Sequence, residues 1–577
     1  MPTKPSNAQI VRLFDTIADY LALDGDSAYR VMAYERASRT LRDYPVSLAD
    51  LAERGGLREL PGIGEAIERK VLEYMETGEV AKLNELRAKY PEGLLEVMHL
   101  PGVGPKTARH LWEALGIIDL EQLKLACERH MIRELPGMGE KTEANLIRAV
   151  ATYEARSGRS LAGTVEPQAA NLVEALRAMP QVVAADYGGS LRRRRSTVRD
   201  IDLVVASAEP GAVMDAFSAR PELAHIDERG ETKLTAVTHT ELNVDLRVVP
   251  PPSYGNLLQH FTGSAEHNVA LRAYAQRHGY KICEYNVEHV ASGRRITCAT
   301  EAEVYELVGL RYIPPELREN QGEIEASEKG LLPHLIELPD LRGDLHVHTD
   351  WTDGRATVEE MAFGALERGL EYICFADHSQ SLAMANGLGP ERLAQQKEVI
   401  QELDARLPGI TLLCGIEVDI LADGRLDLPD ETLAQLDFVT ASIHSGFTQP
   451  QAQIMKRLTN AMENPYVRSI GHPTGRLLGR REPYDVDLEE LARIAVETGT
   501  FLEINASYDR LDLSAPAVRR AVELGAKIVI CTDAHHPTDF DNLKYAVWEG
   551  RRGWLEAKDV MNTQPLSEFR TVLTRKK

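Results

Sequence analysis

The stretch GDLHVHTDWTDGR, residues 343–355, places His346, His348 and Asp353 on and just after a predicted strand. Successive side chains of a strand point to opposite faces, so the two histidines share one face. A single pair of this kind is often structural. By itself, the stretch therefore gives only a modest indication of a metal site.

Short apolar strands alternate with helices beyond this stretch, and each strand ends on a residue that can bind a metal. The alternation predicts a parallel, barrel-like α/β domain, and such barrels gather active sites at the carboxyl ends of their strands. The strand-end residues are His378, Glu417, His444, His472, Asp533 and His535. Histidine and carboxylate ligands without thiolates suit Mn²⁺, Zn²⁺ or Fe²⁺. With these partners, the opening stretch predicts a metal centre.

The chain has 577 residues, which exceeds one hydrophobic core and predicts several domains. No apolar run nears the roughly 20 residues that span a bilayer. The N-terminal residues lack a signal-peptide pattern, and the six cysteines form no CxxC pair. We therefore expect a cytoplasmic protein with reduced thiols.

The net charge of −22 argues against a nucleic-acid partner unless local sites override it. Residues 321–577 carry 42 Asp and Glu against 27 Lys and Arg, so most of the negative charge lies there. That surplus fits cation binding, although a solvated surface explains most of it. The first half is only mildly acidic.

Three copies of a Leu-Pro-Gly-x-Gly pattern begin at Leu60, Leu100 and Leu135. Each copy precedes an amphipathic helical pattern, and the glycines permit a tight hairpin that leaves N–H groups free at the start of the second helix. Such a helix start attracts anions without a net positive charge. One copy would fit an ordinary helical corner. Three predict helix–hairpin–helix binding of DNA, irrespective of sequence, through Gly62, Gly64, Gly102, Gly104, Gly137 and Gly139.

Two aspartates in the predicted strand DIDLVV, Asp200 and Asp202, lie on the same face of that strand. Carboxylates this close repel each other and are commonly held together by divalent cations. A second predicted strand, residues 241–250, supplies Asp245 as a third ligand. A DxD pair alone is also common at solvated strand ends.

The segment GGSLRR, which begins at Gly188, precedes this pair. Gly188 and Gly189 allow the backbone to approach a phosphate, Ser190 can donate a hydrogen bond, and Arg192 or Arg193 can bind bidentately. An arginine run alone would be an ordinary basic patch. Together with three carboxylates it predicts phosphoryl transfer with two hard cations.

Residues 1 to about 318 resemble a family X DNA polymerase, related to polymerase β. The matching motifs are GGSLRR, RDID, NVDLRV and HFTGSAEHN. The resemblance implies an α+β nucleotidyltransferase palm and thumb, with two catalytic Mg²⁺ ions held by Asp200, Asp202 and Asp245. The residues that it places on the incoming nucleotide are Gly189, Ser190, Arg193, Phe261, Gly263 and Asn268.

The chain departs from this family at two places. The family usually has Tyr-Phe where this chain has His260-Phe261, which affects the expected discrimination between deoxy- and ribonucleotides. Lys70 falls at the position of the Schiff-base lysine of the polymerase β lyase domain, but Arg30 and Ala66 stand where the lyase pocket has lysines. Lys70 is thus a possible lyase nucleophile, and a plain surface residue of a helix is the alternative.

Residues 341–577 resemble the PHP (polymerase and histidinol phosphatase) family in all of its motifs. The resemblance implies a distorted (β/α)7 barrel with three metal ions, Mn²⁺ or Zn²⁺. It assigns one ion to His346, His348, Glu417 and Asp533, a second to Glu417, His444 and His472, and a third to Asp353, His378 and His535. Such a cluster favours hydrolysis of phosphodiesters or phosphomonoesters.

The whole chain resembles a bacterial family X DNA polymerase with a C-terminal PHP domain. The expected domains are an N-terminal lyase-like helical domain (1–80), helix–hairpin–helix fingers (81–160), the palm (161–250), the thumb (251–318), a linker (319–340) and the PHP domain (341–577).

The expected function is DNA repair by nucleotide addition at short gaps, with a separate Mn²⁺-dependent 3′–5′ exonuclease. An abasic-site endonuclease or 3′-phosphatase activity is a further option. We expect gapped or nicked duplex DNA and dNTPs as partners, no membrane, and a monomer in the cytoplasm near the nucleoid.

Two alternatives remain open at this point. The barrel could be a phosphoesterase for DNA ends or small phosphoesters, with the polymerase half serving only to bind DNA. The chain could also be a DNA-tethering scaffold with both sites inert. The complete carboxylate, serine and arginine set weighs against the first, and the nine barrel positions weigh against the second.

Overall fold

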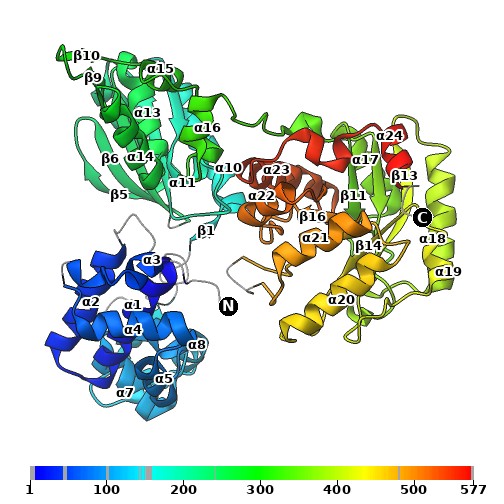
Figure 1. The fold of residues 1–577 in the computed structure, drawn as a ribbon, viewed down its shortest axis with the longest axis horizontal. Helices are drawn as coiled ribbons and strands as arrows, with labels where there is room; N and C mark the ends of the chain where they lie inside the picture. Colours follow the sequence, from blue (N-terminus) through cyan, green and yellow to red (C-terminus); the bar gives the residue numbers. More distant parts are fainter. Residues whose placement is uncertain are drawn as a thin grey trace. The chain divides into compact units, whose positions relative to one another are not determined.

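The computed structural model describes the chain except for residues 1–4, 6, 43–47, 61, 99, 101–102, 141, 145, 148–149, 151–158, 241, 479–480, 482 and 574–577. The chain divides into two compact units, residues 1–158 and residues 159–577 (Figure 1). Within the described ranges, no helix is long and apolar enough to span a bilayer. Each unit has hydrophobic cores of its own.

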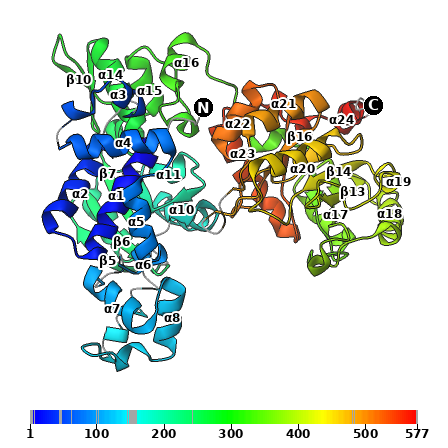
Figure 2. The ribbon, with the colours of Figure 1, turned by 60° about the horizontal axis from the view of Figure 1, so that its bottom comes forward.

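Unit 1 consists of short helices around one apolar core. Along its first helix, Ile10, Phe14, Ile17 and Leu21 recur every three or four residues and are buried. This helix packs beside the second one (Figure 2). The described helices are α1 (Asn7–Asp24), α2 (Ala28–Arg42), α3 (Leu48–Glu53), α4 (Glu65–Thr77), α5 (Ala81–Lys89), α6 (Gly93–Met98), α7 (Pro105–Leu115) and α8 (Leu120–Glu128), with 3₁₀ turns η1 (Leu57–Glu59) and η2 (Ile132–Glu134).

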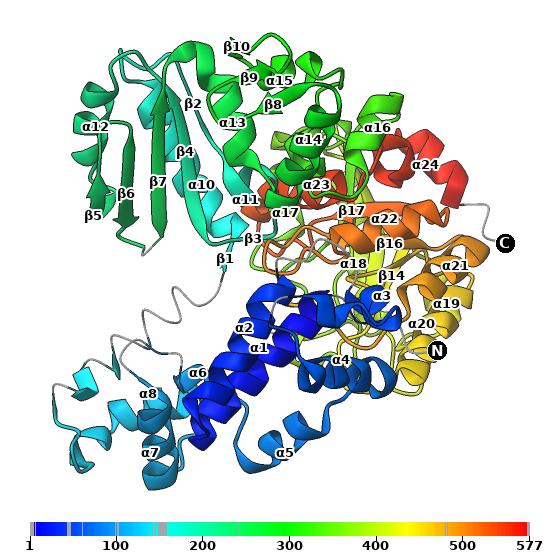
Figure 3. The same ribbon diagram turned by 60° about the vertical axis from the view of Figure 1, so that its left-hand side comes forward.

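The predicted palm opens unit 2 with a five-stranded mixed sheet, seen in Figure 3. Its strands lie in the order β2 (Ala184–Tyr187), β4 (Asp200–Ala206), β7 (Asn243–Val249), β6 (Lys233–Thr238) and β5 (Leu223–Arg229). Strands β4 and β7 run parallel, and the other neighbouring pairs are antiparallel. Helices α10 (Ala162–Arg177) and α12 (Pro210–Ser218) share the core of this sheet. The short strands β1 (Ser160–Leu161) and β3 (Thr197–Val198) pair antiparallel in a sheet of their own, and α11 (Gly189–Arg192) contacts β3 and β4.

The predicted thumb combines helices with a three-stranded antiparallel sheet. Its elements are α13 (Tyr254–Thr262), α14 (Ala265–Arg277), β8 (Tyr280–Ile282), β9 (Val287–His289), β10 (Arg294–Ile296), α15 (Glu301–Leu307) and the 3₁₀ turns η3 (Pro251–Ser253) and η4 (Pro315–Leu317).

Part of the expected linker, residues 319–340, is folded onto the thumb. Helix α16 (Glu323–Lys329) lies within it, and Ile324 belongs to the thumb core. Glu323 is buried, with Oε1 2.6 Å from Nδ1 of the buried His267. The charged composition suggested a linker, because the sequence does not show that Glu323 has a buried partner.

The C-terminal part is a parallel barrel of seven strands in chain order. They are β11 (Gly343–Val347), β12 (Tyr372–Phe375), β13 (Thr411–Asp419), β14 (Phe438–Ser442), β15 (Ser469–Ile470), β16 (Phe501–Asn505) and β17 (Ile528–Cys531). A bridge between Val347 and Ala534 brings the first and last strands together, so the barrel is nearly closed. Strands such as IVIC are apolar throughout because helices cover parallel sheets. The predicted (β/α)7 barrel is confirmed.

Helices alternate with these strands, as Figure 1 shows. They are α17 (Val358–Glu367), α18 (Pro390–Asp404), α19 (Asp430–Leu433), α20 (Gln451–Glu463), α21 (Leu488–Thr498), α22 (Ala515–Glu523), α23 (Leu543–Arg552) and α24 (Leu566–Leu573). The 3₁₀ turns are η5 (Leu338–Asp340), η6 (Ala383–Ala385), η7 (Pro537–Asn542), η8 (Ala557–Asp559) and η9 (Met561–Thr563).

Candidate active sites

Three carboxylates meet at the centre of the palm sheet. Asp202 on β4 is the register partner of Asp245 on the parallel strand β7. Asp200 lies two residues before Asp202, so both point to the same face of β4. The hydroxyl of Thr235 donates to Asp245 Oδ1 at 2.8 Å. The structure thus brings together the three aspartates that the sequence predicted as ligands.

Burial and mutual repulsion disfavour the charged forms of these aspartates. Burial, followed by the charges of Asp200 and Asp245, raises the pKa of Asp202 to about 7. Burial and the charge of Asp245 also raise the pKa of Asp200. Divalent cations would offset this repulsion, and oxygen ligands suit Mg²⁺. The donor set therefore fits hard cations.

A tight glycine turn lies against these carboxylates. Gly189 opens α11 with a φ of +59°, and a Cβ built on it would lie 1.9 Å from Asp202 Oδ2. Only glycine fits this position. Ser190 follows in the first turn of α11. The predicted phosphate-binding residues thus lie next to the carboxylates.

The arginines after this turn have different partners. Arg192 forms a two-point ion pair with Glu301, at 2.9 and 2.7 Å, and donates to the hydroxyl of Thr262. Arg193 donates to the carbonyl of Thr262 at 2.5 Å and to Glu319 at 3.1 Å. Both guanidiniums therefore contact Thr262 of the thumb and one carboxylate each, and the phosphate contact expected of Arg193 stays a prediction.

The other predicted nucleotide residues lie at the same corner. The Cβ of Phe261 lies 3.4 Å from a Cβ built on Gly188, and a Cβ on Gly263 would lie 3.1 Å from Arg193 Nη1. Asn268 donates to the carbonyl of His260 at 2.8 Å. Burial lowers the pKa of His260. The thumb helices α13 and α14 thus place these residues beside the glycine turn.

All nine predicted metal ligands of the barrel gather at the carboxyl ends of its strands. Three groups could each hold an ion, with ligand atoms within 4.8 Å of one another. They are His348, Asp353, His378 and His535; His346, His348 and Asp533; and His378, Glu417 and His444. These groups overlap the three sets implied by the resemblance and differ from them in four ways. His348 and His378 each belong to two groups, Glu417 is absent from the group of His346 and Asp533, and His472 is in no group.

Glu417 lies at the centre of this cluster and is buried. Its Oε1 lies 3.0 Å from His472 Nε2 and 3.2 Å from His444 Nε2, and its Oε2 lies 2.7 Å from His378 Nδ1. His472, which belongs to none of the three groups, is thus within reach of the same carboxylate. Glu417 thus contacts residues of two of the predicted sets, and its role as a bridging ligand stays a prediction.

The ring nitrogens indicate that the cluster suits cations. His346 Nδ1 lies 2.7 Å from Glu503, whereas its buried Nε2 has no hydrogen-bond partner among the described residues. Burial alone would lower the pKa of His378, but the charges and hydrogen bonds of Glu417 and Asp353 together raise it to about 10. Burial and the neighbouring histidines His535 and His378 lower the pKa of His348 to about 3. A bound cation would be coordinated by the inward-facing ring nitrogens and would balance the negative charge of the carboxylates.

Of the residues that support this site, the sequence pointed only to Asp377, beside His378, with a helix cap as its alternative role; Glu503 and Asn505 were not identified. Glu503 accepts from the backbone N–H of His472 at 3.1 Å, and Asn505 donates to Asp533 Oδ2 at 3.0 Å. Both lie on β16, in the segment FLEIN, where a buried charged residue in an apolar strand is the available signal. Asp377 binds Thr349 at 2.9 and 2.7 Å, so it fixes the loop after His348.

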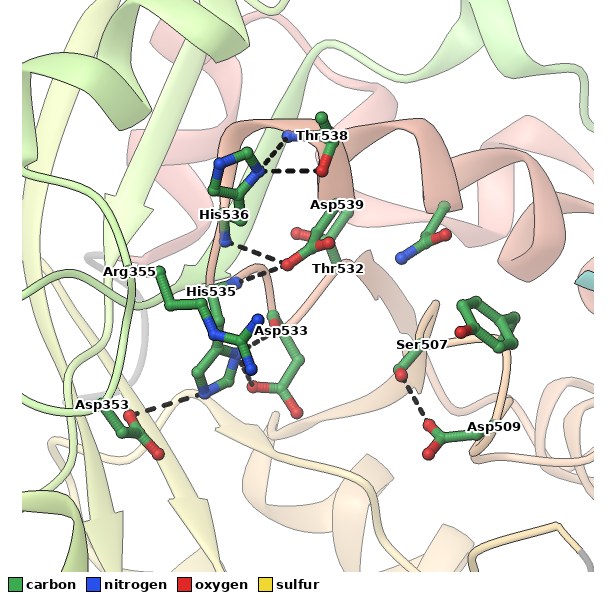
Figure 4. A pocket seen from close by; sticks show the side chains of 12 residues that line it. Asp353, Arg355, Ser507, Asp509, Thr532, Asp533, His535, His536, Thr538 and Asp539 are labelled. Carbon is green, nitrogen blue, oxygen red and sulfur yellow. Dashed lines mark hydrogen bonds and ion pairs between the residues drawn. The ribbon is translucent and has the colours of Figure 1, made fainter.

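A cavity of about 640 Å³ adjoins the cluster on the side of Asp353, Asp533 and His535. Figure 4 shows these side chains facing a common space, with Ser507 and Asp509 across it. The remaining lining residues include Arg355, Tyr508, His536 and Asn542. The volume lies in the range of small-molecule sites.

The hairpins of unit 1 repeat one local geometry. The N–H groups of Ile63, Val103 and Met138 bond to the carbonyls of Leu60, Leu100 and Leu135. Gly64 and Gly104 are the N-cap residues of α4 and α7, and their backbones have almost equal angles. Gly62 and Gly137 have φ near +80°. The carbonyl of Gly139 accepts hydrogen bonds from backbone N–H groups three and four residues later, and the carbonyls of Gly64 and Gly104 likewise accept from the helices that follow them. Gly102 lies outside the described residues.

Lys70 lies on α4 and is half-buried. Its ammonium donates to the carbonyl of Ala66 at 3.3 Å and lies 5.6 Å from the ring centre of Tyr34. Arg30 pairs with Asp26 at 2.9 Å. These contacts fit an ordinary helix residue, and lyase activity at Lys70 stays a prediction.

Comparison with known proteins covers both units. Family models match a helix–hairpin–helix domain at residues 5–80, a SAM-like helix–hairpin–helix tandem at 94–152, a DNA polymerase beta thumb at 257–319 and a PHP domain at 344–507.

Three relatives illustrate this division. DNA polymerase/3′-5′ exonuclease PolX of Bacillus subtilis is 39% identical over 568 residues, which is 98% of this chain and 99% of that protein. DNA polymerase lambda of Rattus norvegicus is 24% identical over 344 residues, 54% of this chain and 56% of that protein. A probable phosphatase of Thermoanaerobacter sp. is 32% identical over 249 residues, 41% of this chain and 95% of that protein.

The near-complete match joins the thumb and hairpin domains to the PHP barrel in one order along the chain. The chain therefore belongs to the family X DNA polymerases that carry a C-terminal PHP domain.

Proposed function

We propose that the palm adds deoxynucleotides at short gaps in duplex DNA and that the barrel hydrolyses 3′ ends in the 3′–5′ direction. The observation that carries the first activity is the in-register pair Asp202 and Asp245, with Asp200 beside it and Gly189 against it. The printed name of the Bacillus subtilis relative, DNA polymerase/3′-5′ exonuclease PolX, supports both activities.

Each set of palm residues has its own role in nucleotide addition. Two Mg²⁺ ions, when bound, would neutralise charge on the phosphates and assist the attacking and leaving oxygens. The carboxylates of Asp200, Asp202 and Asp245 would supply the oxygen ligands of these ions. The backbone at Gly189, the hydroxyl of Ser190 and the guanidinium of Arg193 donate to the triphosphate. Phe261, Gly263 and Asn268 form the wall beside the incoming nucleotide.

The barrel residues perform a separate hydrolysis. Three cations, with Mn²⁺ favoured over Zn²⁺, would supply phosphate binding and water activation there. The cavity at Asp353 and His535 is open enough to admit a terminal nucleotide, and its polar lining suits a sugar and a phosphate. The same chemistry extends to 3′-phosphates and abasic sites, which are further candidate substrates. The similarity to a probable phosphatase supports phosphoester hydrolysis at this site.

The helix–hairpin–helix motifs of unit 1 would form the surface that binds DNA. Gly62, Gly64, Gly104, Gly137 and Gly139, with Gly102, would bind the phosphates of gapped or nicked duplex DNA through backbone N–H groups. This mode needs little positive charge, which fits a chain of net charge −22. A monomer in the cytoplasm, near the nucleoid, suits such a repair enzyme.

One experiment tests both activities. Labelled gapped and nicked DNA is incubated with and without dNTPs, in Mg²⁺ or Mn²⁺, with the wild type, Asp200→Ala and His346→Ala. Asp200→Ala should abolish extension and spare hydrolysis, and His346→Ala should do the reverse. Extension by Asp200→Ala at the wild-type rate would refute the proposal for the palm.

Lyase activity at Lys70 requires its own test. Borohydride should trap a covalent adduct between the protein and DNA that carries a 5′-deoxyribose phosphate, and Lys70→Ala should lose it. The matched control is Lys82→Ala, which removes a lysine on α5 whose ammonium pairs with Glu85. Equal trapping by Lys70→Ala would exclude the assignment.

A further inference from the structure

Helix α23 of the barrel also contacts the palm and the thumb. Lys544 donates to Glu166 on α10 at 2.9 Å, and the hydroxyl of Tyr545 donates to the carbonyl of Gly163 at 3.2 Å. Arg551 donates to Glu316 in η4 at 2.8 Å. These partners are more than 200 residues away in the chain. One helix therefore joins the barrel to both parts of the polymerase half.

Arg194, the third residue of the arginine run, also contacts this helix. Its Cζ lies 4.1 Å from the ring centre of Trp548, within the range of a cation–π contact. Its Nη1 donates to the hydroxyl of Tyr187 at 2.6 Å. Tyr187 is the last residue of β2, directly before the glycine turn. The guanidinium thus joins the start of the turn to a side chain of the barrel.

The backbone of Arg194 closes the other end of the same turn. Its N–H bonds to the carbonyl of Leu191 at 3.0 Å, and the N–H of Arg195 bonds to the carbonyl of Ser190 at 3.0 Å. Arg194 has a φ of +59°, which is unfavourable for a side chain other than glycine. Such a conformation persists only where surrounding contacts hold it. The contacts that Arg194 makes with Trp548 and Tyr187 are suited to this.

We propose that Trp548 is a positioning residue for nucleotide addition. It holds Arg194, and Arg194 holds the turn that presents Gly189 and Ser190 to the triphosphate. This inference rests on the proposed function of the palm. Its consequence is that nucleotide affinity in the polymerase half depends on a side chain of the PHP domain that is not among the nine candidate ligands.

The test compares the full-length wild type with Trp548→Ala, Trp548→Phe and Arg194→Lys. Single-nucleotide insertion into gapped DNA gives KM for dNTP and kcat, and release of a labelled 3′ nucleotide gives exonuclease activity. Trp548→Ala should raise KM about 3- to 10-fold, the loss expected for one partly exposed cation–π contact, with kcat little changed. Trp548→Phe should recover part of the affinity. Arg194→Lys should resemble Trp548→Ala because an ammonium cannot stack as a planar guanidinium does.

The control is Arg551→Gln, a change on the same helix α23 that breaks the ion pair with Glu316 and leaves the glycine turn untouched. It should keep the wild-type KM. The exonuclease should be unchanged in all four variants. Unchanged KM in both Trp548→Ala and Arg194→Lys would overturn the inference, as would an equal loss in Arg551→Gln, which would indicate general undocking. A wild type without any extension product would overturn the proposed polymerase function and this inference with it.

Discussion

Asp202 and Asp245 lie opposite each other on neighbouring parallel strands, in register from Asp200 to Ala206. No basic side chain pairs with Asp202 among the described ion pairs, and burial with two nearby carboxylates raises its pKa to about 7. The fold thus holds carboxylates whose mutual repulsion favours protonation of Asp202. Divalent cations would offset this repulsion.

Extension should therefore depend on pH through Asp202. Below about pH 7 the carboxyl is largely protonated and binds a cation poorly, so the insertion rate should rise as the pH increases through 7. More Mg²⁺ should move the midpoint to lower pH, because the cation competes with the proton. Insertion rates across pH at two Mg²⁺ concentrations measure this. A midpoint that does not respond to Mg²⁺ would contradict the prediction.

In the absence of metal, the stability of the fold should depend on the ionisation of Asp202 and should fall as the pH rises. Because the pKa is raised in the fold, the protonated form favours folding at low pH, and this contribution is lost as the pH rises from about 4 through 7. Asp202→Asn, which stays neutral, should have a higher Tm than the wild type above pH 7 and a similar Tm near pH 4. Thermal melts in EDTA test this, with Asp227→Asn on the exposed strand β5 as the control.

Loss of the central barrel carboxylate should remove metal and hydrolysis together. Glu417→Gln keeps the size of the side chain but removes the charge that faces His378, His444 and His472. Exonuclease activity should fall by more than about 100-fold, because even residues behind the ligands typically contribute 10- to 100-fold. Extension should stay within about twofold of wild type. Bound metal, measured by mass spectrometry, should fall in parallel, and full metal content in the variant would contradict the assignment.

Glu503 should act through His346 rather than on the substrate. Glu503→Gln weakens the 2.7 Å contact with His346 Nδ1 and should lower metal affinity about 10- to 100-fold. Saturating Mn²⁺ should restore exonuclease activity, which would not occur for a residue that binds the substrate. The control is Glu497→Gln on the exposed face of α21. No recovery at high Mn²⁺ would refute this role.

The sequence predicted the ligands better than their surroundings, for physical reasons. The nine candidate barrel ligands could be expected to gather because strand alternation and strand ends place them without knowledge of the tertiary structure. Glu503 lies inside an apolar strand, and only the fold shows that it faces His346. Glu323 looked like part of a charged linker because its partner, His267, lies 56 residues earlier.

The arginine run shows the same limit. The sequence offered Arg192 or Arg193 for a phosphate, because both guanidiniums are equally suited to one. Their partners depend on segments that are far away in the chain. Arg192 pairs with Glu301, Arg193 pairs with Glu319, and Arg194 lies on Trp548, so the predicted role of Arg193 stays a prediction.

DNA binding by the hairpins should be sensitive to a small side chain at Gly104. This glycine has a φ of −101°, which any residue adopts, and a Cβ there would meet no atom within 4 Å. Gly104→Val should therefore fold normally and yet obstruct the approach of a phosphate to the start of α7. The loss of one charge-assisted hydrogen bond predicts roughly tenfold weaker binding. Because no base is read, duplexes of unrelated sequence should lose equal affinity.

Two further variants are compared with Gly104→Val: Gly62→Val, which should also affect folding, and Gly211→Ala, which is the control. Gly62 has a φ of +82°, so Gly62→Val should lower Tm as well as affinity. Gly211 on α12 is exposed with open space around it, and Gly211→Ala should change neither property. Fluorescence anisotropy with gapped DNA at two salt concentrations, beside thermal melts, separates these effects. Wild-type affinity in Gly104→Val would show that the hairpins do not contact the DNA backbone in the proposed way.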